Sequence, residues 1–217
     1  KHITLTANES DNEADDAATN GEDDAPSKKT KDGCSKLSRI HTMALSLGKR
    51  LESVDLSACV ALQVIDTTVL YACPLLRSVR LPAAGFQHLT SIGSYFMSFC
   101  GVECGGGGSE EGEGGGINVL DFGDCPSLTS IGKCFLMQSS VRVVKFGCLP
   151  LLESLSQQFC GHSATLAVVD LSGATSLVDI APTAFEGCKE LAEAVLSSGV
   201  RGDVAVPEHI TEVVRFA

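Results

Sequence analysis

Cysteine and histidine are the residue types here that could act as nucleophiles, bases or metal ligands, and one stretch places both together. FCGH at 159–162 brings Cys160 and His162 within two residues of each other. The side chains of a nucleophile and its base must lie within hydrogen-bonding distance of each other. Closeness in sequence does not ensure this, because the fold decides where each side chain points. Phe159 also fits an inward position of the repeat described below. We therefore expect His162 to lie on a surface turn and predict no catalytic pair here.

Cys100 and Cys104 are the closest pair of cysteines and hence the first candidates for a metal site. Structural zinc takes four ligands, and no second pair stands at ligand spacing. Cys104 also leads into GGGGSEEGEGGG at 105–116, which lacks the Lys-Ser/Thr of a phosphate-binding loop and whose glutamates would repel phosphate. We expect no metal, no cofactor and no small-molecule substrate, and we predict that the chain is not an enzyme.

The chain repeats itself, as the two copies of LTSIG at 89–93 and 128–132 show. A second pattern, apolar-x-x-apolar-x-apolar, recurs every 24 or 25 residues except for one interval of 41. That interval contains the Gly/Glu-rich stretch 101–116, which we interpret as an insertion, and an acidic stretch at 7–33 interrupts an earlier repeat that begins with ITL at 3–5. The hexads are LESVDL (51–56), LRSVRL (76–81), INVLDF (117–122), VRVVKF (141–146), LAVVDL (166–171) and LAEAVL (191–196).

Each hexad predicts one short strand, because its last two apolar residues alternate and so point to one face. One such strand per 24–25 residues cannot bury its face alone, so the copies must stack into a parallel sheet over a continuous core. A second element, Leu-x-x-Ile/Leu followed by another apolar residue, predicts a short strand or helical turn on the outer face. The fold class is therefore a repeat solenoid. With no Trp and only 5% aromatic residues, we expect Leu, Val, Ile and Ala to fill its core.

These repeats resemble two classes of leucine-rich repeat. The pattern L-x-x-I-G-x-x-x-F-x-x-x-C and the segment LVDIAPTAFEGCKEL (177–191) are similar to BspA-like leucine-rich repeats. LDFGDCPSL (120–128) and VLYACPLLRSVRL (69–81) are similar to the cysteine-containing repeats of F-box adaptors. The resemblance covers roughly 34–196 and implies a curved α/β horseshoe, here rich in β-structure, that binds other macromolecules. One departure from the pattern is Ala194, where a large aliphatic residue is expected.

We predict that residues 1–217 form a single leucine-rich repeat domain that belongs to a longer array. VAVPEHITEV (204–213) resembles VRLPAAGFQHLTSI (79–92) with a shorter turn, which predicts that the array continues past the C-terminal residue. The insertions, 7–33 and 101–116, have the low hydrophobicity and the charge of disordered segments. They are either tolerated surface loops or acidic arms that engage a basic partner or become ordered in an assembly.

Most of the ten cysteines recur at two positions of the repeat. A small buried thiol with a weakly donating S–H fits the edge of a core at a turn, so we predict free structural thiols there. Reduced cysteines and the lack of a visible signal peptide lead us to expect an intracellular, cytoplasmic protein. One position holds Cys34, Cys59 and Cys125, with Cys148 one residue short of it, and the other holds Cys73, Cys100 and Cys188.

The outward residue between the two inward ones of each strand changes sign from strand to strand. Opposite charges on adjacent strands stabilise a sheet by about 0.2–1 kcal/mol per pair, and like charges cost a similar amount. The column is either a self-satisfied ladder that fixes strand register or the charged border of a partner-binding surface. Its charged members are Asp55, Arg80, Asp121, Lys145 and Asp170.

A second outward column contains three consecutive valines, Val119, Val143 and Val168. Contiguous apolar surface on an exposed face often marks a partner site. Two interpretations stay open: the valines are the centre of a protein-binding surface, or a capping segment or the Gly/Glu-rich insertion covers them.

The net charge of −11 sits almost entirely in the two insertions. Residues 7–33 carry −6 and residues 101–116 carry −4, so the repeats themselves are close to neutral. Proteins that bind nucleic acids need a basic face to neutralise phosphate, so no nucleic-acid partner is expected. No run of about 18 apolar residues is present, so no membrane insertion is expected either.

These observations favour a non-enzymatic protein–protein interaction module, a scaffold subunit of a larger assembly with an unidentified protein partner. Substrate recognition by an F-box-type ubiquitin ligase adaptor is one alternative, which an F-box helical segment elsewhere in the protein would favour. A surface adhesin is another, which a signal peptide would favour.

Overall fold

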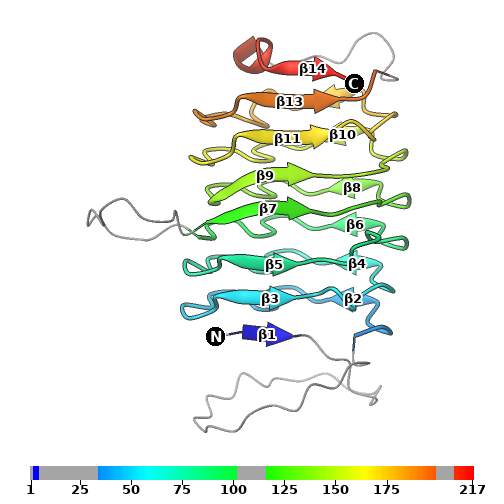
Figure 1. Ribbon diagram of the computed structural model, residues 1–217, viewed down its shortest axis with the longest axis vertical. Helices are drawn as coiled ribbons and strands as arrows, with labels where there is room; N and C mark the ends of the chain where they lie inside the picture. The colour runs from blue at the N-terminus through cyan, green and yellow to red at the C-terminus, as the bar shows by residue number, and fades with distance from the viewer. Residues whose placement is uncertain (1, 5–33, 102–115, 199–207) are drawn as a thin grey trace, which may run out of the picture.

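The computed structural model describes residues 2–4, 34–101, 116–198 and 208–217, which wind through a stack of similar turns (Figure 1). Each complete turn contributes one strand to each of two opposite faces, and every strand runs parallel to the neighbour with which it pairs. Within the described residues the only helical segment is a 3₁₀ turn at Glu208–Ile210. The fold is a parallel β-solenoid, so the predicted repeat solenoid with one short strand per repeat is confirmed. The two predicted insertions lie almost entirely outside the described residues.

The first face is built from the hexads, and its strands show the predicted alternation of buried and exposed residues. In β7, for example, Leu120 is buried between the exposed Val119 and Asp121. A three-stranded sheet contains β1 (His2–Thr4), β3 (Ser53–Asp55) and β5 (Ser78–Arg80). A five-stranded sheet contains β7 (Ile117–Asp121), β9 (Val141–Lys145), β11 (Val168–Leu171), β13 (Glu193–Leu196) and β14 (Val214–Phe216).

The division of this face into two sheets differs from the single continuous sheet that the repeats predict. The break falls between β5 and β7, the two hexad strands whose separation in sequence includes the stretch 101–116. The turn after β5 is also longer than in the next repeats and closes with Gly85, whose backbone lies against that of Gly123. The interruption is confined to the first face, because β6 and β8 of the same two turns pair on the second face.

The second face consists of two-residue strands, each with one outward and one buried residue. The two LTSIG copies lie here side by side, with Ser91 paired to Ser130 and Ile92 paired to Ile131. The glycine of the motif is needed for close approach, because a Cβ on Gly93 would lie 2.5 Å from backbone atoms of the preceding turn. The strands are β2 (Arg39–Ile40), β4 (Val64–Ile65), β6 (Ser91–Ile92) and β8 (Ser130–Ile131) in one sheet, and β10 (Ser154–Leu155) and β12 (Asp179–Ile180) in another.

A continuous stack of phenylalanine rings fills the centre of the solenoid. Neighbouring rings come from successive turns, with ring centroids 4.5 Å apart for Phe122 and Phe146 and 5.0 Å apart for Phe135 and Phe159. The expectation that Leu, Val, Ile and Ala fill the core is therefore wrong for the centre of the solenoid. The low overall aromatic content does not reveal this arrangement, because it does not show that seven of the nine Phe lie in the interior. They are Phe86, Phe96, Phe122, Phe135, Phe146, Phe159 and Phe185.

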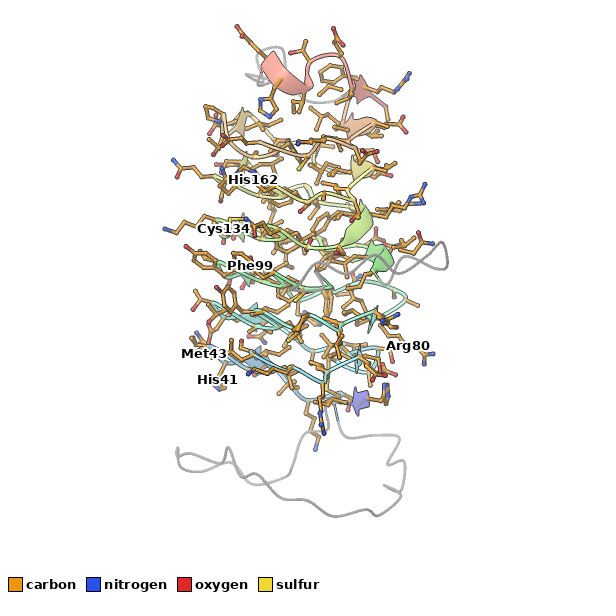
Figure 2. All side chains as sticks on the ribbon, turned by 90° about the vertical axis from the view of Figure 1, so that its left-hand side faces the viewer. His41, Met43, Arg80, Phe99, Cys134 and His162 are labelled. Carbon is orange, nitrogen blue, oxygen red and sulfur yellow. A yellow bond between two sulfur atoms is a disulfide. The ribbon has the colours of Figure 1, made fainter. Side chains whose placement is uncertain are left out.

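The segments that follow β2, β4 and β6 have an unusual backbone. Alternate residues there adopt positive φ, as at Met43 (62°), Leu45 (59°) and Leu47 (57°), and residues one turn further repeat the pattern. Non-glycine residues rarely adopt this conformation, because it costs roughly 1–2 kcal/mol per residue. Hydrogen bonds between turns offset the cost: Leu47 N–H donates to Tyr71 O over 2.7 Å. Figure 2 shows this edge, with Met43 and Phe99 on the side away from Arg80.

The ring stack generates a stability prediction. Phe135→Ala should lower the free energy of unfolding by about 3–5 kcal/mol, because it opens a cavity between the rings of Phe96 and Phe159. Phe216→Ala is the matched control, since this ring is 60% exposed, and it should cost less than about 0.5 kcal/mol. Chemical denaturation followed by circular dichroism measures both, and equal losses would contradict a ring-centred core.

Candidate functional site

The three predicted valines form one straight row on the five-stranded sheet. Val119 pairs with Val143, and Val143 pairs with Val168, so the side chains stand on adjacent strands. Val119 is 44% exposed, and the other two are half-buried. The described part of the chain therefore leaves this row, the valine stripe, open to solvent at β7. On β13 the same column continues with Glu193, which forms an ion pair of 3.3 Å with Arg215.

The charged column beside the stripe is shorter than the sequence predicts. Asp121, Lys145 and Asp170 stand in register on adjacent strands, whereas Asp55 and Arg80 belong to the separate three-stranded sheet. The prediction that charges alternate across five neighbouring strands is therefore wrong, because β5 and β7 do not pair. Within the smaller sheet, Arg80 and Asp55 form an ion pair at 3.8 Å.

The aspartates of this column have a local role that sequence reasoning missed. Asp121 Oδ1 accepts a hydrogen bond from Gly123 N–H at 2.9 Å, and Asp170 Oδ1 accepts one from Ser172 N–H at 3.0 Å. A carboxylate that bonds the backbone two residues ahead fixes the turn that leaves the strand. The recurring pattern Asp-apolar-Ser/Gly, as in VDLS and LDFG, is the signal that could have revealed it.

The carboxylate of Asp55 fixes the turn after its strand in the same way, but it accepts two hydrogen bonds. Its Oδ1 accepts hydrogen bonds from Ser57 N–H at 3.0 Å and Ser57 Oγ at 2.6 Å. Burial acts to raise the pKa of Asp55, but these hydrogen bonds and the charges of Arg80 and His2 outweigh it and hold the pKa below its usual value. This carboxylate is therefore ionised at neutral pH.

A hollow of about 530 Å³ borders the valine stripe on its other side. Asn118 and Arg142, which directly precede Val119 and Val143, line it together with Glu190. Arg142 is exposed and projects from β9, so a cation stands beside the apolar row. The repeat pattern did not single out these residues, because this position of the hexad varies from copy to copy.

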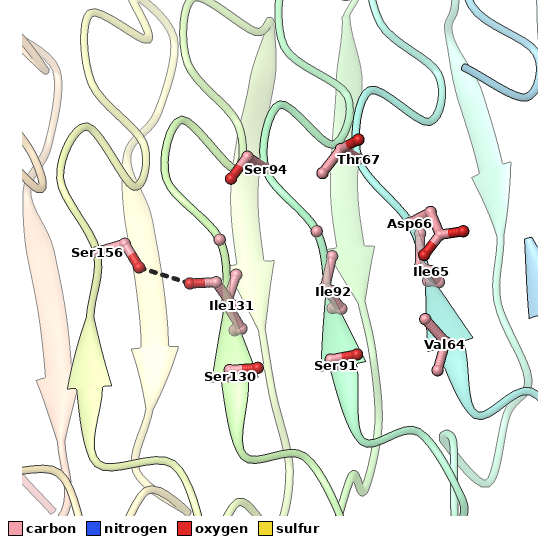
Figure 3. Close-up of a pocket in the computed structure, with 12 residues that line it drawn as sticks. Val64, Ile65, Asp66, Thr67, Ser91, Ile92, Ser94, Ser130, Ile131 and Ser156 are labelled. Atoms are coloured by element: carbon pink, nitrogen blue, oxygen red, sulfur yellow. Dashed lines mark hydrogen bonds between the residues drawn. The ribbon is translucent and has the colours of Figure 1, made fainter. Parts of the chain in front are cut away.

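A second hollow, of about 390 Å³, lies on the opposite face over β4, β6 and β8 (Figure 3). It is lined by the serines of both LTSIG copies, Ser91 and Ser130, and by Asp66 at one end. Asp66 is engaged by Arg39 through two hydrogen bonds of 2.8 and 2.9 Å, and this contact holds the pKa of Asp66 below its usual value. An ionised, paired carboxylate among hydroxyl groups is a poor general acid or base.

The residues considered for catalysis do not converge. Cys160 is fully buried, and burial raises the pKa of its thiol well above the usual value, so it is protonated at neutral pH. His162 is exposed along the positive-φ edge (Figure 2). Among the described residues, no group of three His, Cys, Asp or Glu side chains is placed to hold a metal ion. Cys104 lies outside the described residues.

The cysteines correct one prediction. Cys34 and Cys59 form a disulfide between adjacent turns, with their Cα atoms 4.8 Å apart, so the prediction of free thiols is wrong for this pair. The reason is geometric, since stacking brings equivalent residues of adjacent turns to the Cα separation that a disulfide requires. The seven described cysteines other than this pair are free thiols. The argument from reduced cysteines to a cytoplasmic location loses its basis here.

Comparison of the chain with protein-family models, with curated proteins and with solved structures finds no match in any of the three. The leucine-rich repeat resemblance therefore stays a prediction.

The turn role of the aspartates generates one prediction. Asp170→Ala should cost about 0.5–1.5 kcal/mol of unfolding free energy, because the Ser172 N–H loses its acceptor, whereas Asp170→Asn keeps an acceptor and should be close to wild type. Chemical denaturation distinguishes the two roles. If charge pairing with Lys145 dominated, both variants would lose the same stability.

The lowered pKa of Asp55 generates a pH prediction. Its stabilising contribution is fully present above the unfolded pKa of about 3.9 and is lost as the pH falls through the lower pKa of the folded state. The melting temperature of wild type should therefore exceed that of Asp55→Asn at pH 6–7 and converge with it near pH 2. A difference that is constant across this range would contradict the assignment.

Proposed function

We propose that the protein is a non-enzymatic protein–protein interaction module, a scaffold subunit of a larger assembly, that binds its partner through the valine stripe. The observation that carries this proposal is the row Val119–Val143–Val168, which lies in register on one sheet with Val119 44% exposed. Apolar side chains in a contiguous exposed row lower the free energy when a partner covers them.

The groups beside the stripe define the chemistry of this partner. Asp121, Lys145 and Asp170 border it on one side, and the hollow with Arg142 and Glu190 borders it on the other. Mixed charge on the borders of an apolar centre is typical of protein interfaces, in which rim charges set orientation and association rate. The partner surface therefore presents apolar side chains to the valines, cationic groups to the two aspartates and acidic groups to Lys145 and Arg142.

The same mixed charge argues against nucleic acid as the partner. A phosphate backbone would meet Asp121 and Asp170 as well as Lys145, so the column offers no net attraction. The chain has a net charge of −11, which would add repulsion.

A surface adhesin is the second candidate, and the Cys34–Cys59 disulfide favours it. Disulfides persist mainly in oxidising compartments such as the cell surface. No helix in the described part of the chain is long and apolar enough to cross a membrane. Both candidates are binding functions and use the same surface, so one variant tests either.

The proposal predicts that Val143→Asp abolishes partner capture. A carboxylate in the middle of the stripe must be desolvated on binding without a partner charge, which should weaken affinity at least 100-fold. Affinity purification of the tagged full-length protein from its native source, with quantitative mass spectrometry, measures the loss. Val178→Asp is the matched control, because Val178 is 57% exposed at the start of the second-face element that contains β12.

Circular dichroism and melting temperature should show that both variants keep the fold. The proposal fails if Val143→Asp captures the same proteins in the same amounts as the control does.

A further inference from the structure

We propose that Cys73 and Cys100 are a second cross-linking site, where the chain forms a disulfide between adjacent turns when it folds in the presence of a small disulfide oxidant. The two residues occupy equivalent positions of consecutive turns, each three residues after a buried residue with positive φ, Leu70 or Met97. Cys34 and Cys59, which form a disulfide, are likewise equivalent residues of consecutive turns, at the other recurring cysteine position.

The backbone holds the two cysteines side by side. Gly101 N–H, adjacent to Cys100, donates to Cys73 O at 3.2 Å, which ties the two turns together at this point. Each thiol also points the same way, toward the preceding turn: Cys73 Sγ donates to Leu45 O at 3.1 Å and Cys100 Sγ donates to Leu70 O at 2.8 Å.

In the folded chain each of the two thiols changes the pKa of the other. Contact with the Cys100 thiol lowers the pKa of Cys73, while contact with Cys73 and burial raise the pKa of Cys100 well above its usual value. The thiolate is the attacking species in exchange, so either cysteine can react first while the turns are still open.

The exchange proceeds in two balanced steps with oxidised glutathione as the oxidant. The thiolate of one cysteine, for example Cys73, attacks one sulfur of glutathione disulfide, a mixed disulfide forms, and one glutathione thiolate leaves. Cys100 then loses its proton, its thiolate attacks the Cys73 sulfur, and the second glutathione thiolate leaves. Cys73 and Cys100 are oxidised together by two electrons, and one glutathione disulfide is reduced to two glutathione molecules. Both cysteines are at most 1% exposed in the folded chain, so the exchange takes place before these turns close.

The cross-link would fix the solenoid at the base of the Gly/Glu-rich insertion. Cys100 directly precedes residues 101–116, and the break between β5 and β7 falls at the same turn. A disulfide there ties the chain to the previous turn just before the hydrogen-bonded sheet of the first face is interrupted. Cys34–Cys59 ties the chain at the corresponding point just after residues 7–33.

The test maps disulfides in the full 217-residue chain after refolding in a glutathione redox buffer. Free thiols are alkylated with N-ethylmaleimide in denaturant, and the unreduced chain is cleaved with chymotrypsin, which cuts at Tyr71 between Cys59 and Cys73. Mass spectrometry should find a peptide that links Cys73 to Cys100.

The oxidised chain should also melt about 5–10 °C above a Cys73→Ser/Cys100→Ser variant. Serine suits both sites, because Ser139 and Ser163 occupy the same position in later turns.

Cys160 and Cys188 provide an internal control. They also lie in adjacent turns, but the Cys188 thiol meets the Cys160 carbonyl oxygen at 2.9 Å, so the residues are not equivalent and both should be alkylated. The proposal is overturned if Cys73 and Cys100 are alkylated in most molecules that contain the Cys34–Cys59 link. A link from either residue to any other cysteine would also overturn it.

Discussion

Parallel hydrogen bonding between successive turns holds equivalent residues of this solenoid about 4.8 Å apart, and the main features of the structure depend on that spacing. Any residue type that recurs with the repeat becomes a column of like side chains. Phenylalanines become the ring stack of the core, with Phe122 and Phe146 only 4.5 Å apart. Cysteines become a disulfide, with Cα atoms 4.8 Å apart at Cys34 and Cys59. Valines become an apolar row on the surface.

The same constraint explains the polar columns. A hydroxyl or thiol that recurs at a turn can donate to the carbonyl of the preceding turn, as Ser163 does to Leu136 O at 2.7 Å and Cys100 does to Leu70 O at 2.8 Å. Thr129 repeats the pattern on the second face by donating to Thr90 O at 3.0 Å. Such bonds satisfy buried carbonyls and make the stacking specific. Where extra residues enter the chain, between β5 and β7, the first-face sheet divides, whereas β6 and β8 of the same turns stay paired on the second face.

Surface chemistry in a stack of this kind is organised in rows, which suits binding better than catalysis. A catalytic site needs unlike groups that converge on one atom, whereas stacking places like groups in line. Rows of apolar and charged residues instead match an extended partner. The valine stripe, the charges of Asp121, Lys145 and Asp170 beside it, and the hollow at Arg142 form one continuous surface of this type.

The sequence by itself determined the period, the parallel stacking, the inward residues of each hexad and the alignment of the three valines. A repeat fixes which residues are equivalent, and a strand fixes which of them share a face. Only the tertiary structure decided how the columns interact. It showed that the first-face sheet is divided between β5 and β7 and that Cys34 forms a disulfide with Cys59. It also showed that Asp121 and Asp170 accept hydrogen bonds from the backbone of the turns that follow them. Sequence could not supply these, because they depend on distances between backbones of different turns, and a one-residue difference in turn length changes those distances without altering the repeat pattern.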